Sequence, residues 1–264
     1  MIKAATSEQM EKFHKKYFVP SNCTLAVVGE FIFGEMEEKI RNIFGAVKSE
    51  KFSPPEYFKS SPLEKTIEIE HEMDVNLGYL VIGMSGPDYN HPDQYAVDVL
   101  VQILGRGVAP LLDYSLNSKR RLVYSSGMNY YAQKFGGAIL ILLTAEPKSM
   151  KTAKSEAIKF LRNVRKERFS KDDYSTEEQM YILDFLESAK NQLKLNFHQG
   201  QEVGLDIAGS LSRHLILNED STKGSYLENI NGLTSSDLRK IGGKYLSRGK
   251  YVVVSVVPRK EKND

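Results

Sequence analysis

The sequence has little cysteine, no tryptophan and no long apolar run. Its single cysteine, Cys23, excludes an internal disulfide, and the apolar run around it predicts a buried, unreactive thiol. No stretch approaches the ~20 consecutive apolar residues that cross a bilayer. No basic, apolar and small-residue progression follows Met1, so we predict no signal peptide. The compartment, cytoplasmic or periplasmic, stays open, because many periplasmic proteins also lack disulfides.

An excess of charge of one sign is also missing. The 36 lysines and arginines nearly balance the 34 aspartates and glutamates, so nothing in the net charge predicts a nucleic acid or an anionic membrane as partner. What is present is a hydrophobic fraction of 41% in 264 residues. This composition is typical of a globular protein with a substantial core, built as one large or two small domains.

A faint internal repeat links the two ends of the chain. Residues 6–30 align without a gap with residues 234–258, and each copy has a Ser/Thr start, an amphipathic helix, a Lys-Tyr pair, a turn and an apolar run. Thr6 and Gln9 have the spacing of a capping box, which predicts a helix start. The apolar runs, Cys23–Val28 and Tyr251–Val256, predict a buried strand after each helix.

Composition shifts mark the domain organisation. A second predicted helix over residues 34–47 is followed by a stretch rich in proline, serine and lysine. We therefore expect residues 1–50 to be the carboxy-terminal, helix–strand–helix part of a first α+β subdomain, 51–62 a linker, and 63–260 a complete second α+β subdomain. The first helix begins almost directly after Met1 with no leading strand, which suits a piece of a longer chain.

The second region predicts strands in pairs, with helices between the pairs. Period-two alternation over residues 67–73 predicts an edge strand with Glu68, Glu70 and Glu72 toward water and His71 as a core histidine. Further strands are expected at 76–86, 121–133, 136–146 and 250–258, and helices at 92–103, after Pro147, over 175–217 and at 234–246. This order predicts an α+β fold: a mostly antiparallel sheet with helices packed on one face.

The sequence contains no recognisable set of catalytic residues or metal ligands. The five histidines include no pair at three- or four-residue spacing, and His198 with Glu202 supplies only two ligands on a predicted helix, too few to hold zinc. The three glutamates of residues 67–73 could in principle hold a hard cation or act as acids and bases, but alternation with isoleucine favours a solvent-facing role. No catalytic residue and no metal ligand is therefore predicted.

Two stretches carry a family resemblance. "SEQMEKFHKKYFVPSNCTLAVVGEF", followed by "IRNIFG" and the proline-rich stretch, resembles the join between the two subdomains of a half-molecule in the pitrilysin/insulinase family of zinc metallopeptidases. Matching positions are Tyr17, Phe18, Pro20, Asn22, Val28 and Gly29, with Phe18 replacing a tyrosine and Glu30 an aspartate. Residues 97–143 resemble the family's second subdomain, so the resemblance covers nearly the whole chain.

The resemblance implies a two-subdomain, LuxS/peptidase-like metalloenzyme architecture with the first subdomain truncated. The family binds zinc through His-x-x-Glu-His and a downstream glutamate, and this sequence lacks that motif. Zinc is therefore expected in the parent protein and not in this chain, which is expected to be inactive alone. The resemblance also assigns Tyr124 to a substrate-binding tyrosine, with Asn117 where the family has arginine and Arg120 and Arg121 out of phase. Packing in the core is the other role open to Tyr124, and it is the one we favour.

The preferred interpretation is a non-catalytic portion of a zinc-dependent peptidase that contributes chamber wall and peptide-substrate binding. The alternative is a degenerate, non-catalytic homologue acting as a scaffold or binding subunit for a catalytic partner. An unrelated α+β domain is a third possibility. The apolar strand expected at Cys23–Val28 needs cover, so we expect a homodimer or a catalytic half or subunit of the same family, with peptides as substrates.

Overall fold

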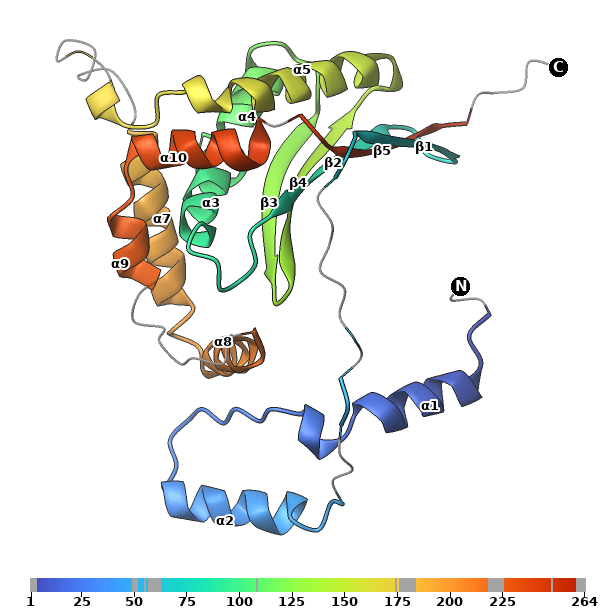
Figure 1. Cartoon of the computed structure of the whole chain (residues 1–264), viewed down its shortest axis with the longest axis vertical. Coiled ribbons are helices and arrows are strands. Elements are labelled where there is room, and N and C mark those ends of the chain that lie inside the picture. Colours follow the sequence, from blue (N-terminus) through green and yellow to red (C-terminus); the bar gives the residue numbers. More distant parts are fainter. Residues whose placement is uncertain are drawn as a thin grey trace. The chain divides into compact units, whose positions relative to one another are not determined.

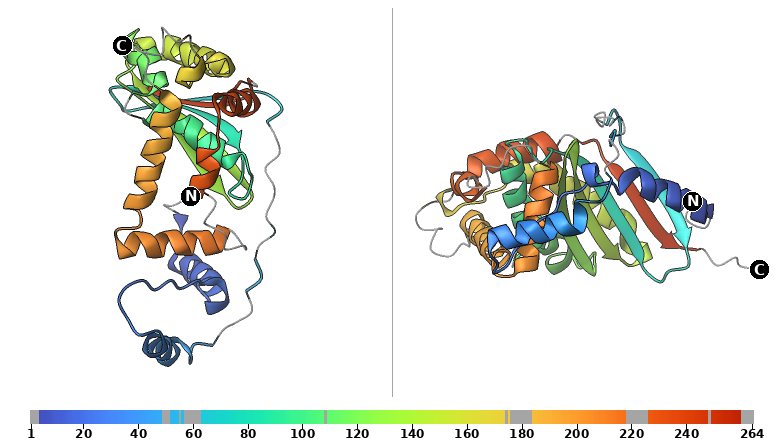
Figure 2. Two further views of the ribbon diagram at one scale, coloured as in Figure 1. Left: turned by 90° about the vertical axis from the view of Figure 1, so that its left-hand side faces the viewer. Right: turned by 90° about the horizontal axis from the view of Figure 1, so that it is seen from below.

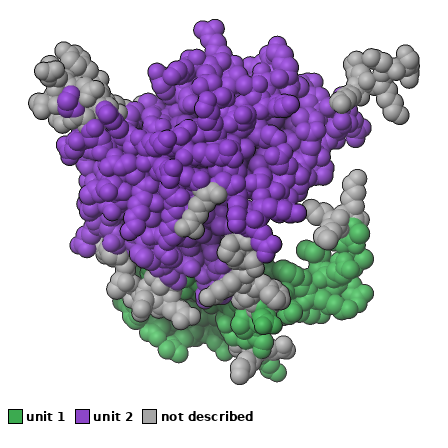
Figure 3. Space-filling model, turned by 45° about the horizontal axis from the view of Figure 1, so that its top comes forward, with its two compact units in different colours: residues 1–58, 198–221 green, residues 59–197, 222–264 purple. Residues whose placement is uncertain are grey.

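The fold was analysed in a computed structural model, which describes residues 4–48, 52–54, 56, 63–107, 109–173, 175, 184–217, 226–247 and 249–259. The chain divides into two compact units, coloured separately in Figure 3. Unit 1 comprises residues 1–58 and 198–221, and unit 2 comprises residues 59–197 and 222–264. The predicted linker, residues 51–62, lies mostly outside the described residues.

Unit 1 is helical where it is described. It contains α1 (Ser7–Tyr17), a 3₁₀ turn η2 (Pro20–Asn22), α2 (Phe33–Phe44) and α8 (Gly204–Leu217). The predicted capping box is confirmed: the Gln9 amide donates to Thr6 Oγ1 at 3.3 Å, and the Thr6 amide donates to Gln9 Oε1 at 3.1 Å. Neither α1 nor α2 contains a buried residue.

The strand predicted over residues 23–28 is wrong. These residues form no strand, Cys23 is exposed, and Leu25 is 57% exposed. A strand requires a neighbour that accepts and donates its backbone hydrogen bonds, and all five strands of the described sheet belong to unit 2. The predicted buried thiol at Cys23 is therefore also wrong, because Cys23 is exposed and no described strand pairs with residues 23–28.

Unit 2 is built on one five-stranded sheet (Figure 1). Its order is β1-β5-β2-β4-β3, and only the β1–β5 pair is parallel. The mostly antiparallel α+β fold is thereby confirmed. The strand bounds are β1 Ile67–Met73, β2 Gly78–Gly86, β3 Ser125–Gln133, β4 Gly136–Ala145 and β5 Val252–Pro258.

Helices of unit 2 connect the strands. They are α3 Gln94–Val101, η3 Gln102–Arg106, α4 Leu111–Asp113, η4 Tyr114–Ser118, η5 Pro147–Ser149, α5 Met150–Asn163, η6 Val164–Lys166, η7 Lys171–Asp173, α7 Phe185–Gln199, α9 Tyr226–Asn231, α10 Ser235–Ile241 and η9 Gly242–Leu246. The single helical region predicted over 175–217 is two helices, α7 and α8, with turns between them. Part of that region, residues 176–183, lies outside the described residues.

The core fills the space between the sheet and these helices. Inward side chains of β2 and β4, such as Ile82 and Ile141, are fully buried, as are Val99 and Leu104 on α3 and η3. By length and composition alone, the helical run Gln94–Ser118 could cross a membrane, but 53% of its most apolar window is buried inside the protein. Core helices pass the same test, so this run is weak evidence for a membrane.

Candidate functional site

The outer strand β1 is the most accessible part of the sheet. It pairs with β5 on one side, and no described strand pairs with its other side (Figures 1 and 2). All seven residues of β1 are exposed. The edge position predicted for this strand is thus confirmed. The core role predicted for His71 is wrong, because His71 is exposed.

The sheet face opposite the helices is apolar and open. The strand register places Val81 beside Leu142 on one side and Val254 on the other, and Leu142 is 43% exposed. No member of this face is buried: Ile67, Ile69, His71, Met73, Tyr79, Val81, Leu140, Leu142, Val252, Val254 and Val256. We call this set the open face. An exposed apolar surface of this kind indicates an interaction surface.

Tyr124 lies at the surface, directly before β3. Tyr124 is 59% exposed, so the core role favoured from the sequence is wrong. The Tyr124 hydroxyl donates to Glu146 Oε1 at 3.0 Å, and Lys148 binds the other carboxylate oxygen at 2.6 Å. The hydrogen bond to Glu146 raises the pKa of the Tyr124 hydroxyl, so the group is a neutral hydrogen-bonding side chain. Its role in substrate binding stays a prediction.

The arginines near Tyr124 do not replace the arginine missing at Asn117. Arg120 is 3.0 Å from Glu156 on α5, so its guanidinium is bound to that helix. Arg121 adopts a left-handed backbone conformation, with φ of 51°, and its amide donates to the Asn117 carbonyl at 2.7 Å. These residues therefore form a tight turn that leads into β3.

The described side chains do not fit a zinc site. Among the residues that the structure describes, no three His, Cys, Asp or Glu side chains gather closely enough to hold a metal ion. The predicted helical pair of His198 and Glu202 does not form, because α7 ends at Gln199 and Glu202 lies in the following turn. The zinc of the family therefore has no fitting ligand set among the residues that the structure describes.

One buried acid was not predicted from the sequence. Asp98 lies within the apolar stripe of α3, and burial raises its pKa to about 7, although the Tyr226 hydroxyl, which donates to Asp98 at 3.4 Å, and nearby Arg106 act in the opposite direction. A lone aspartate in an apolar helical stripe was the signal available in the sequence. Perturbed acids gather at functional sites, but structural positions also produce them.

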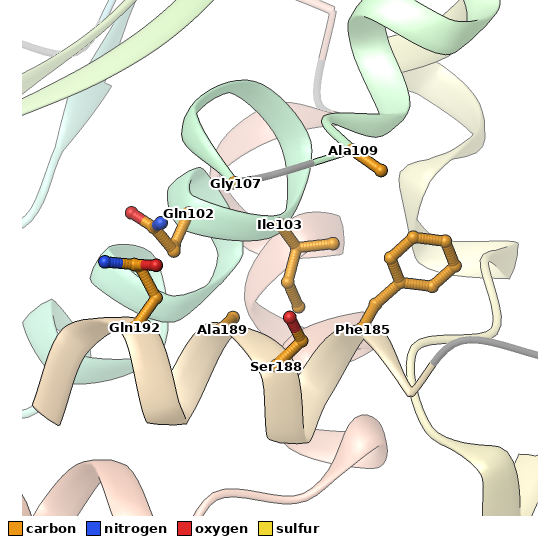
Figure 4. Close-up of a pocket in the computed structure, with 8 residues that line it drawn as sticks. All are labelled: Gln102, Ile103, Gly107, Ala109, Phe185, Ser188, Ala189 and Gln192. Atoms are coloured by element: carbon orange, nitrogen blue, oxygen red, sulfur yellow. The ribbon is translucent and has the colours of Figure 1, made fainter. Parts of the chain in front are cut away.

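The interior holds a small cavity between η3 and α7 (Figure 4). Its volume is about 20 Å³, which is room for one water molecule and no larger ligand. Its lining residues are Gln102, Ile103, Gly107, Ala109, Phe185, Ser188, Ala189 and Gln192. A second, open hollow of about 460 Å³ is lined by Gly86, Pro87, Asp88, His91, Lys134, Phe135, Gly136 and Tyr245. The candidate site for a peptide in unit 2 is the sheet, with its open face and the exposed strand β1.

Comparisons with known proteins agree on one family. A model of the peptidase M16 inactive domain matches residues 4–180. The zinc protease PqqE of Helicobacter pylori is 25% identical over 260 residues, which are 96% of this chain and 55% of that protein. A crystal structure of a Helicobacter pylori protease has a TM-score of 0.84 at 23% identity, over 97% of this chain and 60% of that one.

A second solved structure, the peptidase M16 inactive domain from Pseudomonas fluorescens, has a TM-score of 0.76 at 22% identity, over 98% of this chain and 59% of that one. The chain thus spans 55–60% of the length of these relatives. The family model covers more than half of the chain, and the solved structures share its fold. The chain therefore belongs to the family of peptidase M16 inactive domains, within a zinc protease family, as the sequence resemblance predicted.

Proposed function

We propose that this chain is a non-catalytic portion of a zinc-dependent peptidase, where it walls the substrate chamber and binds peptide substrates along its sheet. The proposal rests on the outer edge of β1, which pairs with no described strand and lies beside the open face, in a chain of an inactive-domain family. An extended peptide gains main-chain hydrogen bonds when it adds to a free sheet edge.

In the parent protein, zinc held by residues outside this chain would supply the activated water for hydrolysis of the peptide bond. The residues of this chain are assigned binding and enclosure only. We further propose that residues 1–50 and 63–260 are the end of one subdomain and the whole of the next. Tyr124 would contact substrate through its hydroxyl, once that group leaves Glu146.

The test combines the purified chain with the zinc-binding part of the same parent protein. We expect the chain alone to contain no stoichiometric zinc by elemental analysis and to cleave no peptide. It should still bind unfolded peptides, and it should restore peptide cleavage when added to the zinc-binding part. Chelator-sensitive proteolysis by the pure chain, or no binding of any peptide, would refute the proposal.

The second candidate is a degenerate homologue that serves as scaffold or binding subunit for a separate catalytic protein. Asn117 at the position of the family's arginine favours it. The mass of the native polypeptide separates the two candidates. A native polypeptide much larger than 29.9 kDa that carries His-x-x-Glu-His supports the first. A native 29.9-kDa polypeptide that copurifies with a separate zinc-binding relative supports the second.

A further inference from the structure

Strand β1 and the residues that flank it are strongly acidic, whereas the chain as a whole has a small positive net charge. Residues 64–74 contain five acidic side chains, Glu64, Glu68, Glu70, Glu72 and Asp74, and one lysine, Lys65. This gives a formal charge of −4 from five acids and one base, in a chain whose net charge is +2. The concentration of acid falls on β1, which is one of the two edge strands of the described sheet, the other being β3.

The backbone of β1 shows which residues face that edge. The Ile67 amide donates to the Tyr251 carbonyl at 2.8 Å, and the Met73 carbonyl accepts from the Arg259 amide at 3.0 Å. Odd-numbered residues of β1 therefore direct their backbone groups at β5. The amides and carbonyls of Glu68, Glu70 and Glu72 point to the outer edge, where an added strand would bind.

The carboxylates of these glutamates lie on the helix side of the sheet. Glu68 pairs in register with the buried Val253 and is bound by Lys154 of α5 at 2.8 Å. Glu70 accepts a hydrogen bond from the Ser255 hydroxyl at 3.4 Å. Within the described part of the chain, Lys154 is the one cation paired with this row of three. On the open-face side, the same strand presents Ile67, Ile69 and Met73.

From this arrangement we infer that the outer edge of β1 binds an extended peptide with lysine or arginine at every second residue and apolar residues between them. The inference rests on the proposed function and names its substrate class. Residues opposite each other in neighbouring strands share a face. Peptide residues opposite Glu68, Glu70 and Glu72 therefore meet carboxylates, and their neighbours meet Ile69 and the open face.

A second copy of this chain is the less favourable occupant of the same edge. Two β1 strands that paired antiparallel would bring the glutamate row of one copy opposite the glutamate row of the other, because residues with outward backbone groups pair together. Like charges directly opposite each other destabilise a sheet, and charged edges are a recognised defence against edge-to-edge association. A basic peptide instead places positive charges opposite the glutamates, which stabilises the pairing.

The test compares labelled heptapeptides by fluorescence anisotropy with the full chain. One alternates lysine and valine, one has the same composition in two blocks, one alternates glutamate and valine, and one alternates threonine and valine. We expect the alternating basic peptide to bind about tenfold more tightly than each of the other three, and its affinity to fall with added salt.

Backbone pairing is tested with N-methyl groups on alternate amides of the basic peptide. Methylation of the amides that face β1 removes the donors, whereas methylation of the other set leaves them. We expect methylation of the amides that face β1 to abolish binding, and methylation of the amides that face away from β1 to leave it nearly unchanged. An equal effect of the two sets would overturn strand addition at this edge.

The double variant Glu70→Lys/Glu72→Lys tests the position of the site. We expect it to prefer the acidic alternating peptide. The matched variant Glu38→Lys/Glu228→Lys makes the same change of net charge at two exposed helical positions and should keep the preference for the basic peptide.

Equal binding of all four peptides, unchanged in the double variant, overturns the inference and leaves the proposed function standing. Failure of all four peptides to bind overturns both. A dimer in sedimentation that is lost in Glu70→Pro makes a second copy the occupant and also overturns the inference.

Discussion

Asp98 makes the stability of unit 2 depend on pH. Its ordinary pKa is 3.8, and burial raises the folded value to about 7. Between these values the folded protein holds a proton that the unfolded chain has released. Stability therefore falls as the pH rises from about 4 to 7, and above pH 7 the folded state carries the whole cost of a buried carboxylate.

We predict that Asp98→Asn stabilises the protein at pH 8 by on the order of 2–4 kcal/mol and changes little at pH 4. Asparagine resembles the protonated acid and keeps an acceptor for the Tyr226 hydroxyl. Urea unfolding at the two pH values measures the difference. The exposed Asp74→Asn is the control for the loss of one negative charge. Equal or lower stability of Asp98→Asn at pH 8 would contradict the prediction.

Asp173 has the opposite pH dependence. Burial raises its pKa, but donors from the Ser235 hydroxyl, the Arg239 guanidinium at 2.8 Å and the amides of Ser170 and Phe169 outweigh burial and lower it to about 2. The side chain is 14% exposed and joins η7 to α10. Because the folded pKa lies below the ordinary 3.8, these bonds stabilise above about pH 4 and are lost as the pH falls toward 2.

We predict that Asp173→Asn destabilises unit 2 by about 1–3 kcal/mol at pH 7, because an amide accepts these hydrogen bonds more weakly. In either orientation its NH₂ also faces a donor, the Arg239 guanidinium at one position or three donors at the other. The difference in stability should be mostly lost by pH 2, where about half of the wild-type carboxylate is protonated in the folded state. Denaturant titrations at both pH values measure it. A gap that persists at pH 2 would show that packing, and not charge, accounts for the effect.

At the scale of elements, Gly105 fixes how closely η3 approaches β3. A Cβ at Gly105 would lie 2.4 Å from the Met128 amide nitrogen, inside any permitted contact. We predict that Gly105→Ala destabilises unit 2 by about 1–3 kcal/mol, because η3 must move off the strand. Gly243→Ala in η9 is the matched control, since its Cβ meets an ordinary contact with Arg165 at 3.9 Å. Thermal unfolding should separate the two variants, and a harmless Gly105→Ala would contradict the close approach.

Elements were predictable from the sequence where local chemistry determines them. The capping box at Thr6 and its counterpart at Thr234 form as their spacing indicates, each with reciprocal hydrogen bonds. Of the two strands predicted to follow these helices, one forms and the other does not. Tyr251 and the strand β5 are inserted between β1 and β2, whereas residues 23–28 have no described strand beside them. Periodicity identifies an apolar run but not its neighbours, so burial of Cys23 could not be predicted.

The sequence also predicted part of the candidate site, namely the edge strand, but not which of its side chains are exposed. Alternation in residues 67–73 correctly indicated an edge strand with glutamates on one side, but it could not show that the other side also lacks cover, which places His71 in solvent. The exposure of Tyr124 depends on where β3 begins, and the desolvation of Asp98 depends on how α9 packs on α3. Both are tertiary properties with no local signal in the sequence.

At the scale of the whole molecule, the two units differ in how their helices are stabilised. In unit 2, α3 buries five residues: Ala96, Val97, Val99, Leu100 and Val101. In unit 1, α1 and α2 bury none, and their apolar residues, such as Phe13 and Phe33, stay exposed. Helices of this length are marginal in water without tertiary packing. The free energy of local opening is therefore much lower in unit 1.

We predict that amides of α1 and α2 exchange with deuterium at least about a hundredfold faster than amides of β2 and β4 in the dilute protein. If a partner covers the apolar residues of unit 1, as expected from the sequence, protection of α1 and α2 should rise with protein concentration or on adding the zinc-binding part of the parent, while β4 stays constant. Hydrogen exchange at two concentrations measures both effects. Protection of α1 equal to that of β4 at the lowest concentration would mean that these helices are stable without cover, which removes the physical reason for expecting a partner there.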